Sequence, residues 1–158
     1  KFITPANYNC KIQTVISGEE SAINEATIKL KELGAKRVIP LKTSGPFHTK
    51  KLEKAKEEYS KELDKITFNK GKVKVIKNID GNYYLENENL KQILAEHIVN
   101  PVRFDKTIEL MENENIDEYI EIGPGKALTG FIKKDIKEAK TYNINNIETL
   151  ENYLKEEI

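Results

Sequence analysis

Short apolar runs rich in β-branched residues alternate along this chain with longer stretches whose apolar residues recur at helical spacing. This alternation predicts an α/β or α+β architecture, in which strands and helices take turns along the chain. We expect extended structure at 2–9, 12–17, 36–41, 73–76, 83–85, 119–122 and 140–144. We expect helices at 19–33, 49–66, 90–99, 104–111, 126–133 and 147–157.

The first third of the chain, up to Leu41, has the order strand–strand–helix–strand. This order fits part of a ferredoxin-like unit that lacks its first strand and first helix. Such a unit would have an unpaired sheet edge, which points to a missing partner segment. The chain also begins with Lys1 and shows no charged-then-apolar leader, so we expect no signal peptide and some missing residues upstream.

Composition excludes several classes of function. Basic and acidic side chains number 26 each, so the net charge is zero, whereas a nucleic-acid binder normally has a basic excess. No apolar run approaches the ~20 residues of a membrane span. The single cysteine, Cys10, rules out an internal disulfide and a Cys-cluster zinc site, and it favours a reducing cytoplasm. We therefore expect no nucleic acid, membrane or metal among the partners of this chain.

Few residues are candidates for chemistry. His48 lies in a loop between a predicted strand and a predicted helix, where α/β proteins often place functional residues, although a lone loop histidine is more often only a polar side chain at the surface. His97 lies in an apolar helical stretch. No serine stands in the G-x-S-x-G setting of a nucleophile elbow, and Cys10 is most simply a small buried hydrophobic residue. The turn at 123–126 is neither a Walker A loop nor a dinucleotide fingerprint.

Four segments together are more specific than any of these residues. They are PANYNCKIQTVISG at 5–18, GAKRVIPLKTSGPFH at 34–48, NPVRF at 100–104 and EIGPGKALTG at 121–130. In order and spacing they resemble segments of the malonyl-CoA:acyl carrier protein transacylases. The resemblance covers almost the whole chain but only the C-terminal half of the family's length. It implies that 1–41 is part of an inserted ferredoxin-like small domain and 42–158 the C-terminal part of an α/β-hydrolase-like domain.

The resemblance also implies a reaction and roles for residues. A serine in the family's elbow takes the malonyl group from malonyl-CoA, and the phosphopantetheine thiol of acyl carrier protein then accepts it, with no separate cofactor. His48 matches the catalytic histidine, the general base. His97 matches the residue, usually Gln, whose main-chain carbonyl orients that histidine. Phe47 and Asn9 match substrate-binding positions, and a bulky Phe47 should exclude an α-methyl branch.

The chain departs from the family pattern at several positions. The elbow serine, the arginine that binds the malonyl carboxylate and the oxyanion-hole Gln fall in the part that is absent. We therefore expect the chain alone to be inactive and count the missing N-terminal half among its partners. The change from Gln to His97 should be tolerated if only the carbonyl is used, because every residue supplies one. Pro46, and Thr49-Lys50, replace the usual Ala and Ser-Pro beside His48.

An alternative reading is a non-catalytic module that binds acyl carrier protein. An elbow motif upstream in the same gene would favour the enzyme, and its absence would favour the module. A ferredoxin-like nucleic-acid binder is disfavoured by the zero net charge and by the lack of an aromatic RNA-binding strand.

Overall fold

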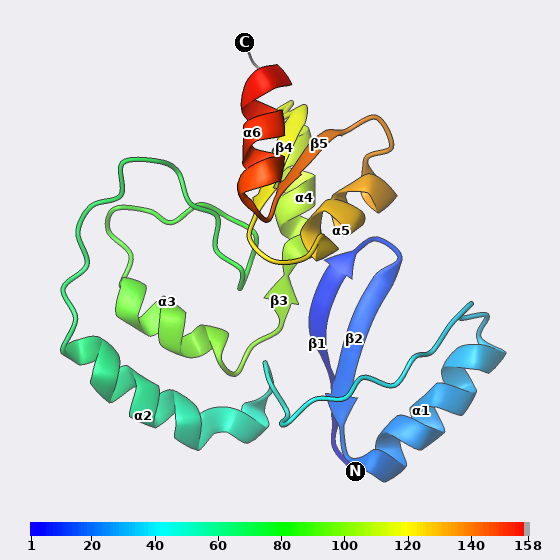
Figure 1. The fold of residues 1–158 in the computed structure, drawn as a ribbon. Helices are drawn as coiled ribbons and strands as arrows, with labels where there is room; N and C mark the ends of the chain where they lie inside the picture. Colours follow the sequence, from blue (N-terminus) through cyan, green and yellow to red (C-terminus); the bar gives the residue numbers. More distant parts are fainter. Residues whose placement is uncertain (157–158) are drawn as a thin grey trace.

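A computed structural model describes residues 1–156. It is a mixed α/β structure whose elements spread in three directions from the strand β1 (Figure 1). The strands are β1 (Ile3–Cys10), β2 (Gln13–Gly18), β3 (Val102–Arg103), β4 (Glu118–Ile122) and β5 (Lys140–Ile144). The helices are α1 (Glu20–Glu32), the short 3₁₀ helix η1 (Lys50–Leu52), α2 (Glu53–Asp64), α3 (Leu90–His97), α4 (Phe104–Asn113), α5 (Ala127–Asp135) and α6 (Ile147–Glu156).

The first sheet has the order β2-β1-β3 and joins segments about 90 residues apart in sequence. β1 and β2 are antiparallel, whereas β3 pairs parallel to β1 through Asn7 with Val102 and Tyr8 with Arg103. The register of the hairpin breaks between Tyr8 and Cys10. A break of this kind bends a strand and redirects its side chains. Two of the motif segments found in the sequence, PANYN and NPVRF, are therefore neighbours in one sheet.

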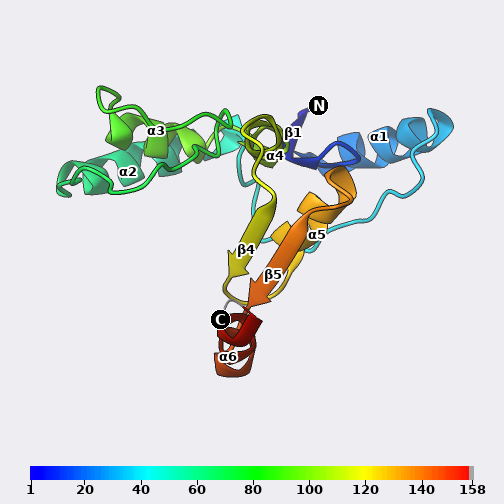
Figure 2. The same cartoon turned by 90° about the horizontal axis from the view of Figure 1, so that it is seen from above.

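The second sheet is the parallel pair β4 and β5, connected by α5. This strand–helix–strand unit is the one that the alternating pattern near the C-terminus predicts. α6 follows β5 and packs on it, with the rings of Tyr142 and Tyr153 in edge-to-face contact at 4.7 Å. Figure 2 shows this sheet pointing away from the layer that contains α1, α2 and α3.

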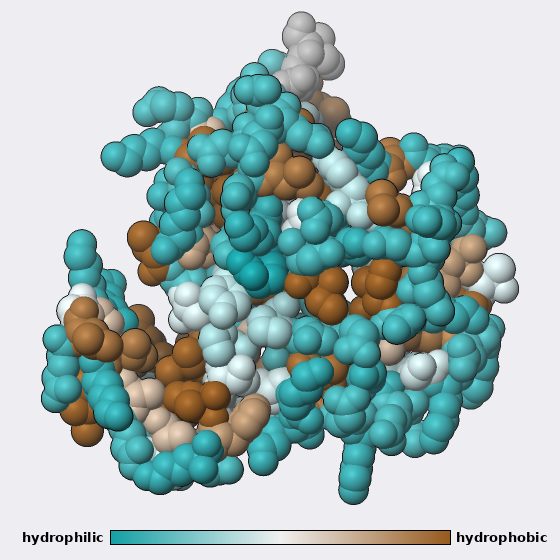
Figure 3. Space-filling view, turned by 180° about the vertical axis from the view of Figure 1, so that it is seen from behind, coloured by the Kyte–Doolittle hydropathy of each residue, from teal (hydrophilic) through white to brown (hydrophobic). Residues whose placement is uncertain are grey.

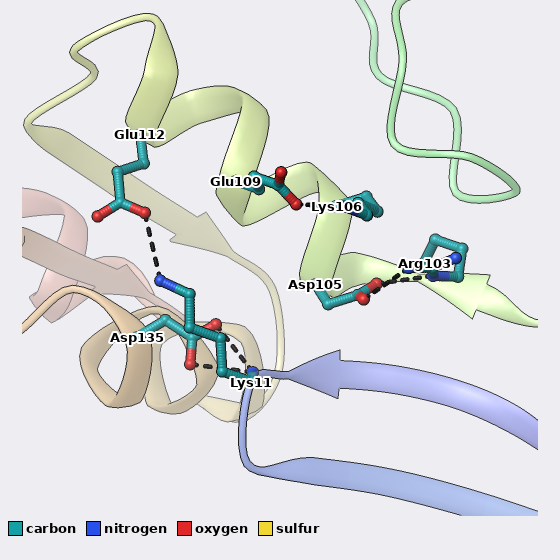
Figure 4. Close-up of polar contacts among 7 residues, drawn as sticks. All are labelled: Lys11, Arg103, Asp105, Lys106, Glu109, Glu112 and Asp135. Carbon is teal, nitrogen blue, oxygen red and sulfur yellow. Dashed lines mark hydrogen bonds and ion pairs between the residues drawn. The ribbon is translucent and has the colours of Figure 1, made fainter.

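A small core holds the two sheets together. Its fully buried members come from β1, α4, β4 and α5, and they are Cys10, Ile108, Tyr119 and Ile132. Cys10 is a free, buried residue, as the sequence indicates. Polar contacts around the core tie the same elements: the Lys11 backbone N–H donates to both oxygens of Asp135, and its ammonium group reaches Glu112 (Figure 4).

The segment 65–89 crosses from α2 to α3 without regular structure, but it is anchored at two points. Lys77 is 5% exposed and pairs with Glu88 at 2.6 Å. Gly81 has a positive φ of 74°, and a Cβ there would lie 2.3 Å from the Cβ of Lys106 on α4. Only glycine permits this close approach and this backbone conformation without a shift.

Two predicted strands are wrong. Residues 36–41 form no strand among the described residues, and 73–76 contributes only an isolated bridge between Ile76 and Tyr83. Both segments have the β-branched composition of strands, but a strand exists only where a neighbour accepts its hydrogen bonds. The order strand–strand–helix–strand is thus realised only as strand–strand–helix in 1–41. Ile39, 67% exposed, and Leu41 have no apolar covering in this structure.

Of the extended structure predicted at 83–85, only Tyr83 takes part in a β-bridge, the isolated one to Ile76. The remaining predicted elements are confirmed, with ends that differ by a few residues. The helix predicted at 49–66 begins as η1 and continues as α2. The last residue of the helix predicted at 147–157 lies outside the described residues. Within 1–156, no helix has the length and apolar character needed to cross a membrane.

Candidate active site

His48 is held by the carbonyl oxygen of His97. The Nδ1 atom of His48 lies 3.0 Å from this oxygen. Because a carbonyl can only accept, Nδ1 must carry the hydrogen, and this fixes the tautomer of the neutral ring. The other ring nitrogen, Nε2, then has its lone pair available to accept a proton. The structure thus brings together the two histidines that the sequence singled out, which are 49 residues apart.

The carbonyl of His97 is available because α3 ends there. The last carbonyls of a helix have no intrahelical partner. In this helix the N–H groups of Ile98 and Val99 turn back to the oxygens of Ala95 and Glu96, and Pro101 has no N–H to continue the ladder. The orienting acceptor is therefore a rigid helix terminus rather than a mobile side chain.

α3 is fixed against α2 by an ion pair. The Lys56 ammonium lies 2.6 Å from Glu96, the residue before His97, and 2.7 Å from Glu53. The hydrogen bond from Lys56 lowers the pKa of Glu96, although burial opposes it, and Asn100 also donates to this carboxylate. The helix that supplies the His97 carbonyl is thus anchored one residue before it.

The backbone of His48 is strained. Its φ is +58°, in the left-handed region that few residues other than glycine adopt. Strain of this kind costs on the order of 1–3 kcal/mol and is found at functional sites when the surroundings hold it in place. At this site the neighbour Thr49 holds the turn: its hydroxyl donates to the Pro46 carbonyl at 2.8 Å and accepts from the Lys51 N–H at 3.3 Å.

Thr49 is a structural contact of the His48 turn that is not evident from the sequence. It is 1% exposed and caps η1, so it connects the strained turn at His48 to the start of the α2 segment. A Thr directly before a helical stretch is an N-cap signal that was available in the sequence. What the sequence did not show is that the same hydroxyl also closes the loop around His48.

The imidazole of His97 packs beside that of His48. The ring centroids are 5.1 Å apart and the ring planes are tilted by 37°. Burial lowers the pKa of His97 below its usual value of 6.5, and the neighbouring His48 lowers it further. The Nε2 atom of His97 is buried and has no hydrogen-bond partner within the described part of the chain.

The two predicted substrate-binding residues are placed differently. Phe47 directly precedes His48, and the residue is 51% exposed. Asn9 lies in β1 at the break in the hairpin register, and no hydrogen bond within residues 1–156 joins it to either histidine. Phe47 is therefore near His48 because it is the preceding residue in the chain. Asn9 has no direct hydrogen bond to His48 or His97.

The remaining motif residues make contacts of their own elsewhere in the fold. Arg103, of NPVRF, makes a two-point ion pair with Asp105 at 2.8 and 2.9 Å (Figure 4). Its guanidinium group also lies 4.6 Å from the centroid of the Tyr8 ring. In EIGPGKALTG, Glu121 accepts hydrogen bonds from the first turn of α5, and Gly123 and Gly125 both have positive φ. These contacts are structural and none of them involves His48.

As a class, this is a mixed α/β protein that presents a histidine with a fixed tautomer and a free proton-accepting nitrogen. No group of three or more metal-binding side chains occurs in residues 1–156. No hydrogen bond in this range joins His48 to a serine or to Cys10. The described residues therefore hold a proton acceptor that is hydrogen-bonded to no serine or cysteine among them.

Comparison with known proteins identifies the family. The family model described as an acyl transferase domain matches residues 2–156, and the chain belongs to this family. A malonyl CoA-acyl carrier protein transacylase of Staphylococcus aureus is 37% identical over 97% of the chain. A crystal structure of the malonyl CoA-acyl carrier protein transacylase of Clostridium perfringens is 41% identical over 98% of the chain, with a TM-score of 0.92.

A further structure, 30% identical with a TM-score of 0.91, is a malonyl-transacylase in complex with a type II PKS acyl-carrier protein. The chain spans about half the length of these relatives: 50% of the S. aureus protein and 49% of the C. perfringens chain. The mixed α/β fold is therefore shared with malonyl transacylases over nearly all of residues 1–158.

Proposed function

We propose that this chain is the C-terminal half of a malonyl-CoA:acyl carrier protein transacylase of fatty acid biosynthesis, and that His48 is its general base. Membership of the acyl transferase family and the relatives' names support the reaction class. The observation that carries the role of His48 is its hydrogen bond to the His97 carbonyl, which leaves Nε2 free. A non-catalytic binding module would not need a strained histidine held in one tautomer.

In the first half-reaction, a serine of the missing half attacks the thioester carbonyl of malonyl-CoA. A serine alcohol is a weak nucleophile at neutral pH and needs a base next to it. His48 Nε2 takes the hydroxyl proton as the oxygen–carbon bond forms. The carbon–sulfur bond then breaks, and the imidazolium returns the proton to the departing CoA sulfur, which leaves a malonyl ester on the serine.

In the second half-reaction, the phosphopantetheine thiol of acyl carrier protein replaces CoA. His48 accepts the thiol proton, the thiolate attacks the ester carbonyl, and the serine oxygen recovers the proton as it leaves. A carbonyl on Nδ1 orients the ring without adding the negative charge that an aspartate would provide. We infer that this weaker support suits transfer to a thiol, because the acyl ester must outlast its exposure to water.

The missing half should complete both predicted domains. We propose that 1–41 belongs to a ferredoxin-like small domain and 42–158 to an α/β-hydrolase-like domain. Large apolar side chains that nothing covers support this: Figure 3 shows apolar residues exposed over α1 and the extended segment after it, where Leu33 is 84% and Ile39 67% exposed. A contiguous surface of this kind usually marks an interface.

A second uncovered surface lies along β4, where Ile122 is 78% exposed. Beside it is a groove of about 290 Å³ whose lining includes Phe104, Met111 and Leu128. An exposed parallel strand is unusual, because parallel sheets are normally buried on both faces. We propose that the N-terminal half covers this surface too.

The single buried cysteine fits a cytoplasmic protein, as expected from the sequence.

The test is transfer of malonyl from malonyl-CoA to acyl carrier protein by an acyltransferase that contains this chain. His48→Asn removes the base and keeps a residue type that tolerates positive φ. Asn115→Ala is the matched control, because Asn115 has nearly the same φ, +57°, outside the site. We expect His48→Asn to lose roughly 10²–10⁴-fold of the rate and Asn115→Ala to retain it. Activity of His48→Asn within a few-fold of wild type would contradict the role of His48.

A further inference from the structure

The contact between the two histidine rings has no role in the reaction as proposed above. The His97 carbonyl alone would fix the His48 tautomer, and any residue type at position 97 would supply that carbonyl, with or without a ring. Yet this chain places the imidazole of His97 5.1 Å from that of His48, within the range of favourable aromatic contacts. The chain contains only these two histidines, and the fold brings them together.

We propose that the side chain of His97 is a second positioning element for His48, and that it acts as a neutral ring packed against the base. This inference rests on the proposed function, since it assumes that His48 is the base. The carbonyl restrains His48 at Nδ1, and the His97 ring restrains one side of the imidazole. Both restraints come from a single residue at the end of α3.

The surroundings of His97 support a ring that stays neutral. Its Nε2 is buried without a hydrogen-bond partner among residues 1–156, so a proton placed there would have no acceptor. A buried N–H of a charged ring without an acceptor is strongly unfavourable. Burial, and then the repulsion from a protonated His48, also lower the pKa of His97. A proton gained by His48 during catalysis is therefore not passed on to His97.

The charged groups on the neighbouring elements do not raise the pKa of His97 again. α3 contributes Glu96, and α2 contributes Lys56 and Glu53, which are joined in ion pairs of 2.6 and 2.7 Å. The positive charge of Lys50, in η1, lowers the pKa of Glu96. His48 is the only charged neighbour that shifts the pKa of His97 among the described residues.

Kinetics of an active acyltransferase that contains this chain test the positioning role. His97→Ala keeps the backbone carbonyl and removes the ring, and it should lower kcat by roughly fivefold at unchanged KM for malonyl-CoA. His97→Phe restores an uncharged ring and should recover most of this loss. Gln92→Ala, on an exposed position of the same helix, is the control and should leave kcat unchanged. Equal kcat for wild type and His97→Ala would overturn the proposal.

Nuclear magnetic resonance of the same protein tests the neutral state without relying on activity. The imidazole signals of His48 and His97 are assigned with the His48→Asn and His97→Phe variants and followed as the pH is lowered. The His97 ring should become protonated only below pH 6.5, the usual pKa of a free histidine. Protonation of His97 at or above pH 6.5 would overturn the proposal. If wild type transfers no malonyl, the proposed function fails, and the titration still decides whether His97 is a neutral ring.

Discussion

The carboxylate of Glu121, in β4, accepts two hydrogen bonds from Thr129, one from its backbone N–H at 2.8 Å and one from its hydroxyl at 2.6 Å. A third comes from the N–H of Leu128 at 3.2 Å. The free N–H groups of a helix's first turn are thereby satisfied by a residue outside the helix. The carboxylate thus locks the Gly123-Pro124-Gly125 turn between β4 and α5.

This relationship predicts a pH-dependent contribution of Glu121 to stability. Burial would raise the pKa of Glu121, but the hydrogen bonds from Thr129 and Leu128 outweigh it and lower the pKa below 4.5. The folded state therefore favours the carboxylate more than the unfolded state does. This stabilisation is complete above pH 4.5 and is lost as the pH falls below that value.

Glu121→Gln should thus have a lower urea unfolding midpoint than wild type at pH 7. The difference between the two midpoints should become smaller as the pH falls below 4.5. Urea unfolding of both proteins across pH 3–7 measures this. Glu148→Gln, an exposed carboxylate in the first turn of α6, is the control and should change the midpoint little. A gap between Glu121→Gln and wild type that is constant with pH would show that the Glu121 charge has no part in locking the turn.

Removing the Thr49 hydroxyl should affect both stability and activity. Thr49→Val keeps the shape of the side chain but leaves the Pro46 carbonyl and the Lys51 N–H without this partner. Loss of a buried hydrogen-bond partner costs about 1–3 kcal/mol. We expect a lower free energy of unfolding and, in an active acyltransferase that contains this chain, a lower kcat, because the strained His48 is less well held.

Two further variants separate these effects. Thr49→Ser retains the hydroxyl and should restore most of the activity. Thr43→Val makes the same chemical change at an exposed loop position and should alter neither quantity. If Thr49→Val lowered stability but left kcat intact, the hydroxyl would serve the fold alone and not the orientation of His48.

Much of this arrangement could be predicted from the sequence, because it depends on local signals. The helices and the β4–α5–β5 unit follow from periodicity and turn residues, and the pairing of His48 with His97 follows from the family resemblance. The strand predicted at 36–41 could not be judged locally, because a strand needs a neighbour and the composition of one segment does not show whether that neighbour is present. The double role of Thr49 and the ring contact of His97 depend on tertiary placement.

The chain alone should not become malonylated when incubated with malonyl-CoA. It has four serines, and none stands in a nucleophile elbow. Cys10, the remaining candidate nucleophile, is 3% exposed and therefore protected from a thioester in solution. Intact-mass spectrometry after incubation should show the unmodified mass. A stoichiometric malonyl adduct on Cys10 or on any of the serines would contradict the proposal that the nucleophile lies outside this chain.

Phe47→Ser should relax selectivity toward methyl-branched malonyl groups in an acyltransferase that contains this chain. Phe47 directly precedes His48 and is half exposed, so its side chain is available to line the acyl pocket that the proposed reaction requires. Replacing the ring by a hydroxymethyl group opens space next to the α-carbon of the acyl chain. A methyl group that fills this space gains ~1 kcal/mol of apolar contact, the scale for one buried CH₂, while malonyl loses packing.

The ratio of methylmalonyl to malonyl transfer should therefore rise by about tenfold. It is measured with both thioesters competing in one vessel, so that enzyme concentration and folded fraction cancel. Phe68→Ser, an exposed ring in the 65–89 segment, is the control and should leave the ratio unchanged. An unchanged or lower ratio for Phe47→Ser would mean that the ring points away from the acyl chain, and that selectivity for malonyl arises elsewhere, because residue 47 would then contribute no wall to the pocket.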